Sequence, residues 1–221
     1  QAPRNLIAIQ SGLNDVRALW DQPASNQPFL IYANNNDKAI GFGGGTFSFE
    51  AAVRFRQEEL AIYKADKYQI TDISFLPLTR QNSWTITFYE ADTMTPLYSQ
   101  FIDGTSLQYG IENTITLSEA LEIPEGKDII FGILADVTNY GGYDIMGVIF
   151  NQSEPGYTDL LRQKDAEFFS LYESAHESEV GAYEYNISWA MGIHLSNASS
   201  AALNDIQEYR VYANGNQVAT T

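Results

Sequence analysis

The stretch Trp84-Thr85-Ile86-Thr87-Phe88-Tyr89 decides the fold, because apolar and more polar side chains alternate along it with a period of two. Successive side chains of a β-strand point to opposite faces of a sheet, so this stretch predicts a strand with one buried and one wet face. A second stretch, Ile129-Ile130-Phe131-Gly132-Ile133-Leu134, has no polar side chain. Such runs are typical of strands covered on both sides. Together the two patterns predict a β-sandwich with covered central strands.

Alternation and short apolar runs predict further strands along most of the chain, which makes the expected fold class all-β. These strands are Asn5–Gln10, Val16–Trp20, Thr46–Phe55, Tyr68–Leu76, Leu97–Phe101, Asn113–Leu117, Ile145–Phe150, Phe168–Tyr172, Asn186–Leu195 and Glu208–Ala213. Helix is expected at Arg56–Ala65, with single turns around Ser118–Leu121 and within Ala201–Ile206. Glycine and asparagine pairs such as Asn214-Gly215 favour the tight turns that join antiparallel strands.

Composition excludes several classes of protein. The chain has 221 residues and no cysteine, so its core is large enough to be stable without disulfides, and the absence of cysteine leaves the redox compartment open. The longest apolar runs have the length of a strand and fall far short of the roughly 20 residues of a membrane helix. A net charge of −16 and a pI near 4.3 argue against nucleic acid and anionic membranes as partners.

Catalytic constellations are scarce in the sequence. His176 and His194 are the two histidines; His176 lies in an acidic polar segment and His194 in an apolar strand, where a core or edge histidine is the simpler interpretation. Without cysteine or a helical histidine pair, a zinc site is not expected. Carboxylates are abundant, but apart from Tyr183-Glu184-Tyr185 few alternate with aromatics as in jelly-roll glycosidases. We therefore predict a protein that is not an enzyme.

The order of several segments resembles the extracellular jelly-roll modules of Bacteroidetes-type secreted proteins, the group that includes the cleaved adhesin domains of gingipain-type proteases. The resemblance is carried by Gly41-Phe42-Gly43-Gly44-Gly45, Phe49–Phe55, Leu60–Tyr63, Ile70–Phe75, Trp84–Ile86, Leu97–Gln100, Ile123–Ile129 and Trp189. It implies a jelly-roll β-sandwich in a secreted or cell-surface protein, whose signal or lipid anchor would lie upstream of Gln1. It also implies a role in cell adhesion, with glycan, extracellular protein or neighbouring domains of the same polypeptide as partners.

The two ends of the chain carry a second resemblance. Residues 2–8 and 16–20 are similar to the first two strands of a fibronectin type III domain, and residues 209–219 are similar to its third and fourth strands. The resemblance implies a partial fibronectin-like unit, formed by 1–28 with 206–221, into which the jelly roll of 29–205 is inserted. Two hairpins are expected to share the apolar residues Leu6, Ala8, Leu19, Val211 and Val218.

The segment from Asp136 to Asp144 is the candidate for ligand binding. Its tyrosine rings could stack on sugar faces while its polar groups read hydroxyls, which makes Asn139, Tyr140 and Tyr143 candidate glycan contacts. An ordinary loop that caps the edge of the sandwich explains the same residues. Relatives with structural calcium motivate a second hypothesis, a calcium site formed by Asp136, Asn139 and Asp144, although the spacing is not that of an EF-hand. No other cofactor is expected.

The function predicted first is a non-catalytic extracellular adhesion or accessory module of a larger protein. The alternative is a carbohydrate-binding module attached to a hydrolase, and a jelly-roll glycosidase is the third reading. Trp20, Trp84 and Trp189 are predicted to be core residues rather than ligand platforms, because each lies on a strand among apolar residues.

Overall fold

The computed structural model describes residues 4–10, 16–21, 28–31, 40–42, 48–136, 145–150, 153–163, 166–177, 186–197, 210–213 and 216–220. The chain divides into two compact units, one formed by Gln1–Pro28 with Ser196–Thr221 and the other by Phe29–Leu195. The boundaries predicted from the sequence were 28/29 and 205/206, against 28/29 and 195/196 in the structure.

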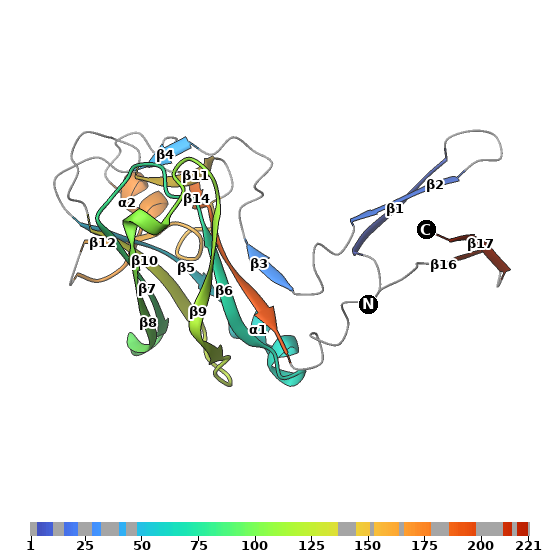
Figure 1. The fold of residues 1–221 in the computed structure, drawn as a ribbon, viewed down its shortest axis with the longest axis horizontal. Coiled ribbons are helices and arrows are strands. Elements are labelled where there is room, and N and C mark those ends of the chain that lie inside the picture. Colours follow the sequence, from blue (N-terminus) through green and yellow to red (C-terminus); the bar gives the residue numbers. More distant parts are fainter. Residues whose placement is uncertain are drawn as a thin grey trace. The chain divides into compact units, whose positions relative to one another are not determined.

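The unit formed by the two ends contains two antiparallel hairpins. Strand β1 (Arg4–Gln10) pairs with β2 (Val16–Asp21), and β16 (Arg210–Ala213) pairs with β17 (Asn216–Thr220) (Figure 1). Both predicted hairpins are therefore present. The side chains of their expected shared core, and that of Trp20, lie outside the described residues, and the fibronectin-like interpretation remains a prediction.

The larger unit has a six-stranded antiparallel sheet as its first layer, with the strand order β13-β12-β5-β10-β7-β8. Its strands are β5 (Phe49–Phe55), β7 (Ser83–Glu90), β8 (Thr95–Asp103), β10 (Ile129–Asp136), β12 (Leu160–Gln163) and β13 (Phe169–Ser170).

The second layer combines two smaller sheets, with the orders β3-β15-β6-β9 and β14-β11-β4. Its strands are β3 (Phe29–Ile31), β4 (Ile40–Phe42), β6 (Gln69–Phe75), β9 (Asn113–Glu122), β11 (Met146–Phe150), β14 (Ile187–Trp189) and β15 (Met191–Ser196). An antiparallel bridge between Pro77 and Met146 links them, and Ala190 alone separates β14 from β15.

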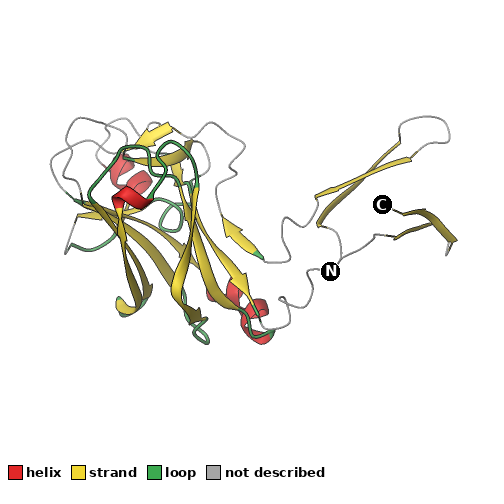
Figure 2. Ribbon diagram, viewed as in Figure 1, coloured by secondary structure: helices red, strands yellow, loops and turns green. Residues whose placement is uncertain are grey.

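The chain crosses between the layers at most connections, from β5 to β6, back to β7, and again from β8 to β9 to β10. This is the crossing pattern of a jelly roll, and the larger unit is an all-β sandwich as predicted. Strands dominate Figure 2, and the helical elements are α1 (Gln57–Ala65), α2 (Leu171–Glu177) and the single turn η1 (Gly104–Ser106) among the described residues. Neither α-helix described here has the length and apolar character needed to cross a membrane.

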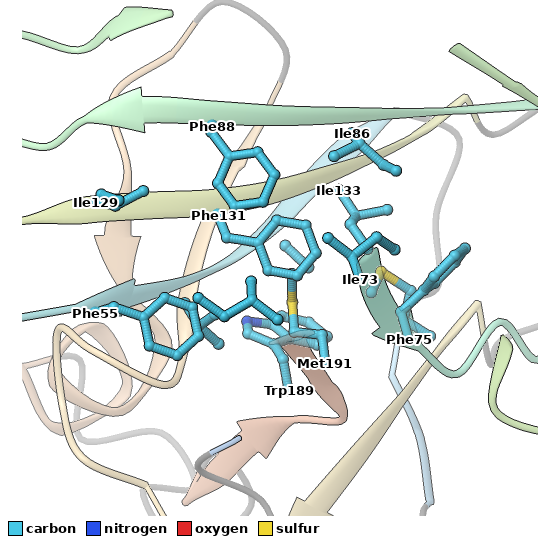
Figure 3. Close-up of a cluster of buried hydrophobic side chains, with 14 of the residues drawn as sticks. Phe55, Ile73, Phe75, Ile86, Phe88, Ile129, Phe131, Ile133, Trp189 and Met191 are labelled. Atoms are coloured by element: carbon cyan, nitrogen blue, oxygen red, sulfur yellow. The ribbon is translucent and has the colours of Figure 1, made fainter. Parts of the chain in front are cut away.

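The core fills the space between the layers. Phe55, Phe88 and Phe131 of the first layer face Ile73 and Met191 of the second (Figure 3). Phe88 and Phe131 stack with ring centroids 4.9 Å apart. The core also encloses both described tryptophans, Trp84 and Trp189, which are 0 % exposed. Their predicted place in the core is confirmed.

Three expectations for local structure need correction or lie outside the described residues. Ser118–Leu121 was expected to be a turn but belongs to β9, where the register against β6 shifts; the irregular pattern in the sequence reflects this bulge. Phe168–Tyr172 was expected to be a strand, but α2 begins at Leu171, because the Ser170 hydroxyl accepts the backbone N–H of Glu173 and so caps the helix. The expected turn within Ala201–Ile206 falls outside the described residues.

Candidate functional site

The outer face of the six-stranded sheet carries the most distinctive polar chemistry of the described residues. On β10, Ile129, Phe131 and Ile133 enter the main core, so the even-numbered residues face outward. Ile130 on this outer face belongs to a second apolar cluster with Ala52, Tyr89 and Leu160. The central strand is therefore covered on both sides, which confirms the interpretation of residues 129–134.

Strand register arranges the outward side chains in rows that cross the sheet. One row runs from β12 to β8 through Arg162, Glu50, Leu134, Thr85 and Phe101. The next row runs through Leu160, Ala52, Gly132, Thr87 and Ser99.

Small residues in the second row create space above the sheet. A Cβ on Gly132 would lie 2.2 Å from Oε1 of Glu50, so the carboxylate occupies the volume that any other residue would fill. The absence of a side chain at Gly132 allows Glu50 on β5 and Tyr89 on β7 to meet across the intervening strand β10.

Glu50 is the centre of a closed polar cluster. Its Oε2 accepts hydrogen bonds from Nε of Arg162 at 2.8 Å and lies 2.7 Å from Nη2 of the same guanidinium. Its Oε1 accepts the Tyr89 hydroxyl at 3.0 Å, and that hydroxyl accepts Nη2 of Arg162 at 2.6 Å. Both carboxylate oxygens are therefore occupied, and the residue is 3 % exposed.

Burial dominates the electrostatics of this cluster. Loss of solvation raises the pKa of Glu50 above its usual value, and this effect outweighs the Arg162 charge and the hydrogen bonds from Arg162 and Tyr89, which act in the opposite direction. Burial also raises the pKa of Tyr89, with a further contribution from the neighbouring Glu50. The cluster thus pairs Glu50 with Arg162 in surroundings whose low solvation favours the protonated, uncharged form of Glu50.

Aromatic rings cover the cluster. The Arg162 guanidinium lies 4.3 Å from the Phe168 ring centroid and 4.9 Å from that of Tyr89, at distances typical of cation–π contacts. Tyr89 was expected on a wet face but is 7 % exposed, and Thr87 is also 7 % exposed. That expectation was wrong at both positions. At Tyr89 the reason is that Arg162 and Phe168 lie against its ring.

The other half of the outer face is open and carries hydroxyls around one aromatic ring. Phe101 on β8 is 67 % exposed, with the half-buried Thr85 opposite it and the exposed Ser99 on the same face of its strand. The row beyond Phe101 consists of Asp136, Ser83 and Asp103. We call these residues together with Leu134 the outer β8 face.

Both carboxylates of the outer β8 face are held in fixed orientations. Asp136 accepts hydrogen bonds from the hydroxyls of Ser48 and Ser83 at 3.2 and 3.3 Å. Oδ1 of Asp103 accepts the backbone N–H and the hydroxyl of Thr105, and these hydrogen bonds lower the pKa of Asp103 below its usual value. Asp103 therefore remains ionised at neutral pH.

Of the residues predicted to bind ligand or calcium, Asp136 is described and the others are not. Asn139, Tyr140, Tyr143 and Asp144 lie outside the described residues, so both predicted sets stay predictions. Within the described ranges, no group of three or more histidine, cysteine, aspartate or glutamate side chains could hold a metal ion.

His194 makes the interactions expected of a structural histidine. Its Nε2 lies 2.7 Å from the Ser74 hydroxyl, and its ring stacks on Phe29 with centroids 4.2 Å apart. Burial lowers the pKa of His194 below its usual value. Ser74 is 0 % exposed, so its hydroxyl has no access to solvent, whereas His194 is partly exposed. The side chain of His176 lies outside the described residues.

Sequence reasoning missed Glu50 and Arg162. Glu50 and Arg54 are the two charged residues of the segment Phe49–Phe55, and a charge within an otherwise apolar strand is a usable signal for a polar cluster. Arg162 carried no such signal, because β12 has four residues and was not predicted as a strand.

Comparisons with known proteins give the fold and little more. No family model matches the chain, and no curated protein matches it. A solved structure of the clostridial cysteine protease Cwp84 after propeptide cleavage is similar, with a TM-score of 0.51 and 11% identity. The similarity covers 84% of this chain and 43% of that one, so this chain is similar to less than half of the solved protease chain.

Proposed function

We propose that this protein is a non-catalytic extracellular adhesion or accessory module of a larger secreted or cell-surface protein, binding glycan or protein through the outer face of its six-stranded sheet. The observation that carries the proposal is the contrast between the two halves of that face. The half with reactive chemistry is closed, whereas the half with an exposed aromatic ring and hydroxyls is open.

The closed half argues against acid–base catalysis. A general acid or base must reach the proton that it transfers, but Glu50 is 3 % exposed and both of its oxygens have partners. The hydroxyl of Ser74, the partner of His194, is equally inaccessible, since Ser74 is fully buried. These two arrangements are the described ones that most resemble catalytic pairs, and each is better suited to holding strands together.

An accessory role fits the similarity to Cwp84, in which a sandwich like this one forms less than half of a longer protease chain. Fold alone does not carry function, so this similarity supports an attached module without indicating what this chain is attached to. Sites on such folds are defined by their own side chains.

A carbohydrate-binding module attached to a hydrolase is the second candidate. Phe101 favours it, because an aromatic ring that is 67 % exposed on a sheet face offers a flat apolar surface to a sugar ring. The loop hypothesis for Asn139, Tyr140 and Tyr143 stands beside it as a prediction. The loop hypothesis predicts that Tyr140→Ala and Tyr143→Ala each abolish glycan binding.

A structural calcium site formed by Asp136, Asn139 and Asp144 also remains a prediction. A cation that binds the folded state alone raises its stability. We expect the melting temperature to rise when calcium replaces EDTA, and to lose that response in Asp144→Asn. An unchanged melting temperature with calcium and with EDTA would exclude the site.

The central experiment is a glycan array probed with the purified chain, combined with mass spectrometry of the same glycans after prolonged incubation. The proposal predicts binding to glycan or to an extracellular protein, with no shortened glycan products. Shortened products that disappear in Glu50→Gln would overturn the non-catalytic assignment. Binding to sugars of one defined structure, abolished by a single aromatic substitution, would favour the carbohydrate-binding module.

A further inference from the structure

The outer β8 face has a size and chemistry that define its ligand more closely. It spans the three adjacent strands β10, β7 and β8, which places its outer strands about 10 Å apart across the sheet at the usual strand spacing. From Asp103 through Phe101 to Ser99 it extends about 13 Å along β8 at the usual rise per residue. These dimensions match two or three linked sugar rings.

The side chains alternate between one apolar platform and several polar contacts. The Phe101 ring is the platform, and the hydroxyls of Thr85 and Ser99 lie in neighbouring positions on the same face. Hydroxyl groups both donate and accept hydrogen bonds, whereas ionised carboxylates accept them. The combination suits a ligand with many hydroxyls and one apolar ring face.

Charge restricts the ligand further. None of the seven residues of the outer β8 face is cationic, two are aspartates, and the whole chain carries a net charge of −16. The described arginines of β5 and β12 are engaged with acidic partners, Arg54 with Asp128 and Arg162 with Glu50. Arg80 is close enough to Asp103 to contribute to its lowered pKa, but the two aspartates and the net charge of the chain still favour neutral glycans over sulfated or uronic acid glycans.

We propose that the outer β8 face is a binding site for a neutral oligosaccharide of two or three sugar units, stacked on Phe101 and hydrogen-bonded to Thr85, Ser99 and Asp103. This inference rests on the proposed binding function and names its ligand class and its surface. It differs from the hypothesis for Asn139, Tyr140 and Tyr143, none of which belongs to the outer β8 face.

The test compares affinities of the full chain for neutral probes, namely cello-, manno- and galacto-oligosaccharides of two to six units, and for acidic probes, namely polygalacturonate and hyaluronate. We expect a neutral probe to bind and the acidic probes to fail. Phe101→Ala should weaken binding at least tenfold without changing the melting temperature, since its ring is mostly exposed. Thr85→Val, which removes a hydroxyl and keeps the shape, should weaken binding about threefold or more.

Ile62→Ala is the matched control, because Ile62 is an apolar side chain on α1 that is 63 % exposed, and it should bind as the parent does. Equal binding by Phe101→Ala, preference for acidic probes, or loss in Tyr140→Ala alone would overturn the site and leave the binding function standing. Failure of every sugar to bind would overturn the ligand class, with a protein partner as the remaining form of the proposed function.

Discussion

Replacing Arg162 with methionine tests how charge and packing contribute to the closed half of the outer face. Arg162→Met keeps an unbranched side chain against Phe168 but removes the cation that pairs with Glu50. The Glu50 carboxylate, which is 3 % exposed, then keeps the hydrogen bond from the Tyr89 hydroxyl. Breaking a buried ion pair at one partner leaves an uncompensated charge in surroundings that cannot solvate it. We expect a loss of about 3–5 kcal/mol in the free energy of unfolding at pH 7.

Removing both charges should be far less harmful. Replacing a buried ion pair with apolar side chains is often neutral, or stabilising by about 1–4 kcal/mol. Here the Tyr89 hydroxyl also loses its acceptor, at a cost of about 1–3 kcal/mol. The free energy of unfolding of the double variant Glu50→Met/Arg162→Met should therefore lie within about 2 kcal/mol of that of the parent. Adding Glu50→Met should thus restore much of the stability that Arg162→Met removes.

The pH dependence has a definite sign. The pKa of Glu50 in the folded state is raised above its usual value of 4.5, so the folded protein binds the proton more tightly than the unfolded chain does. Its contribution to stability is full below the usual value and declines as the pH rises through the folded-state pKa. Arg162→Met removes an influence that lowers this pKa, so its stability should decline further with rising pH, whereas the double variant should lack this slope.

Urea unfolding at several pH values between 5 and 8 measures these effects, with Glu90→Gln as the control. Glu90 pairs with Lys127 at 3.1 Å near the surface, and its loss should cost no more than about 1 kcal/mol. A double variant that is less stable than Arg162→Met would refute the reasoning, because the unpaired Glu50 carboxylate would then cost the fold less than its replacement by methionine.

Three further predictions concern buried polar groups. Trp84→Ala and Trp189→Ala should each cost about 3–5 kcal/mol in urea unfolding; Trp189→Phe should cost about 1–3 kcal/mol more than Trp84→Phe, because Nε1 of Trp189 donates to the Leu160 carbonyl at 2.8 Å while Nε1 of Trp84 has no partner among the described residues. The pKa of His194 lies below its usual 6.5, so stability should be full above that value and fall as the pH drops below it; melting curves of His194→Gln should lack this step. Asp159, 0 % exposed, accepts hydrogen bonds from Gly156 N–H, the Ser170 hydroxyl and Tyr172 N–H, so Asp159→Asn should lose about 2 kcal/mol or more, and an unchanged urea midpoint would contradict this role.

Much of the sandwich could be predicted because burial leaves a local pattern in the sequence. The alternation of Trp84, Ile86 and Phe88 reports which residues face the core, and it does so without knowledge of which strands are neighbours. The same reasoning failed at Tyr89, since the pattern cannot show what covers the opposite face. It also failed at β12, whose four residues are too few to display a period.

The candidate site was harder to predict because its members meet only after the strand order is established. Glu50 is 39 positions from Tyr89 and 112 from Arg162, and nothing in either local sequence specifies that β12 and β7 flank β5 and β10. Gly132 had a local explanation as an ordinary member of an apolar strand, yet its missing side chain provides the space for the Glu50 carboxylate. A glycine inside a strand is destabilising on propensity alone, so its presence there indicates a close approach from a neighbour. For this fold, a strand glycine beside a strand with one buried charge is the feature of the sequence that points to the closed half of the outer face, whereas Phe101 on an edge strand points to the open half.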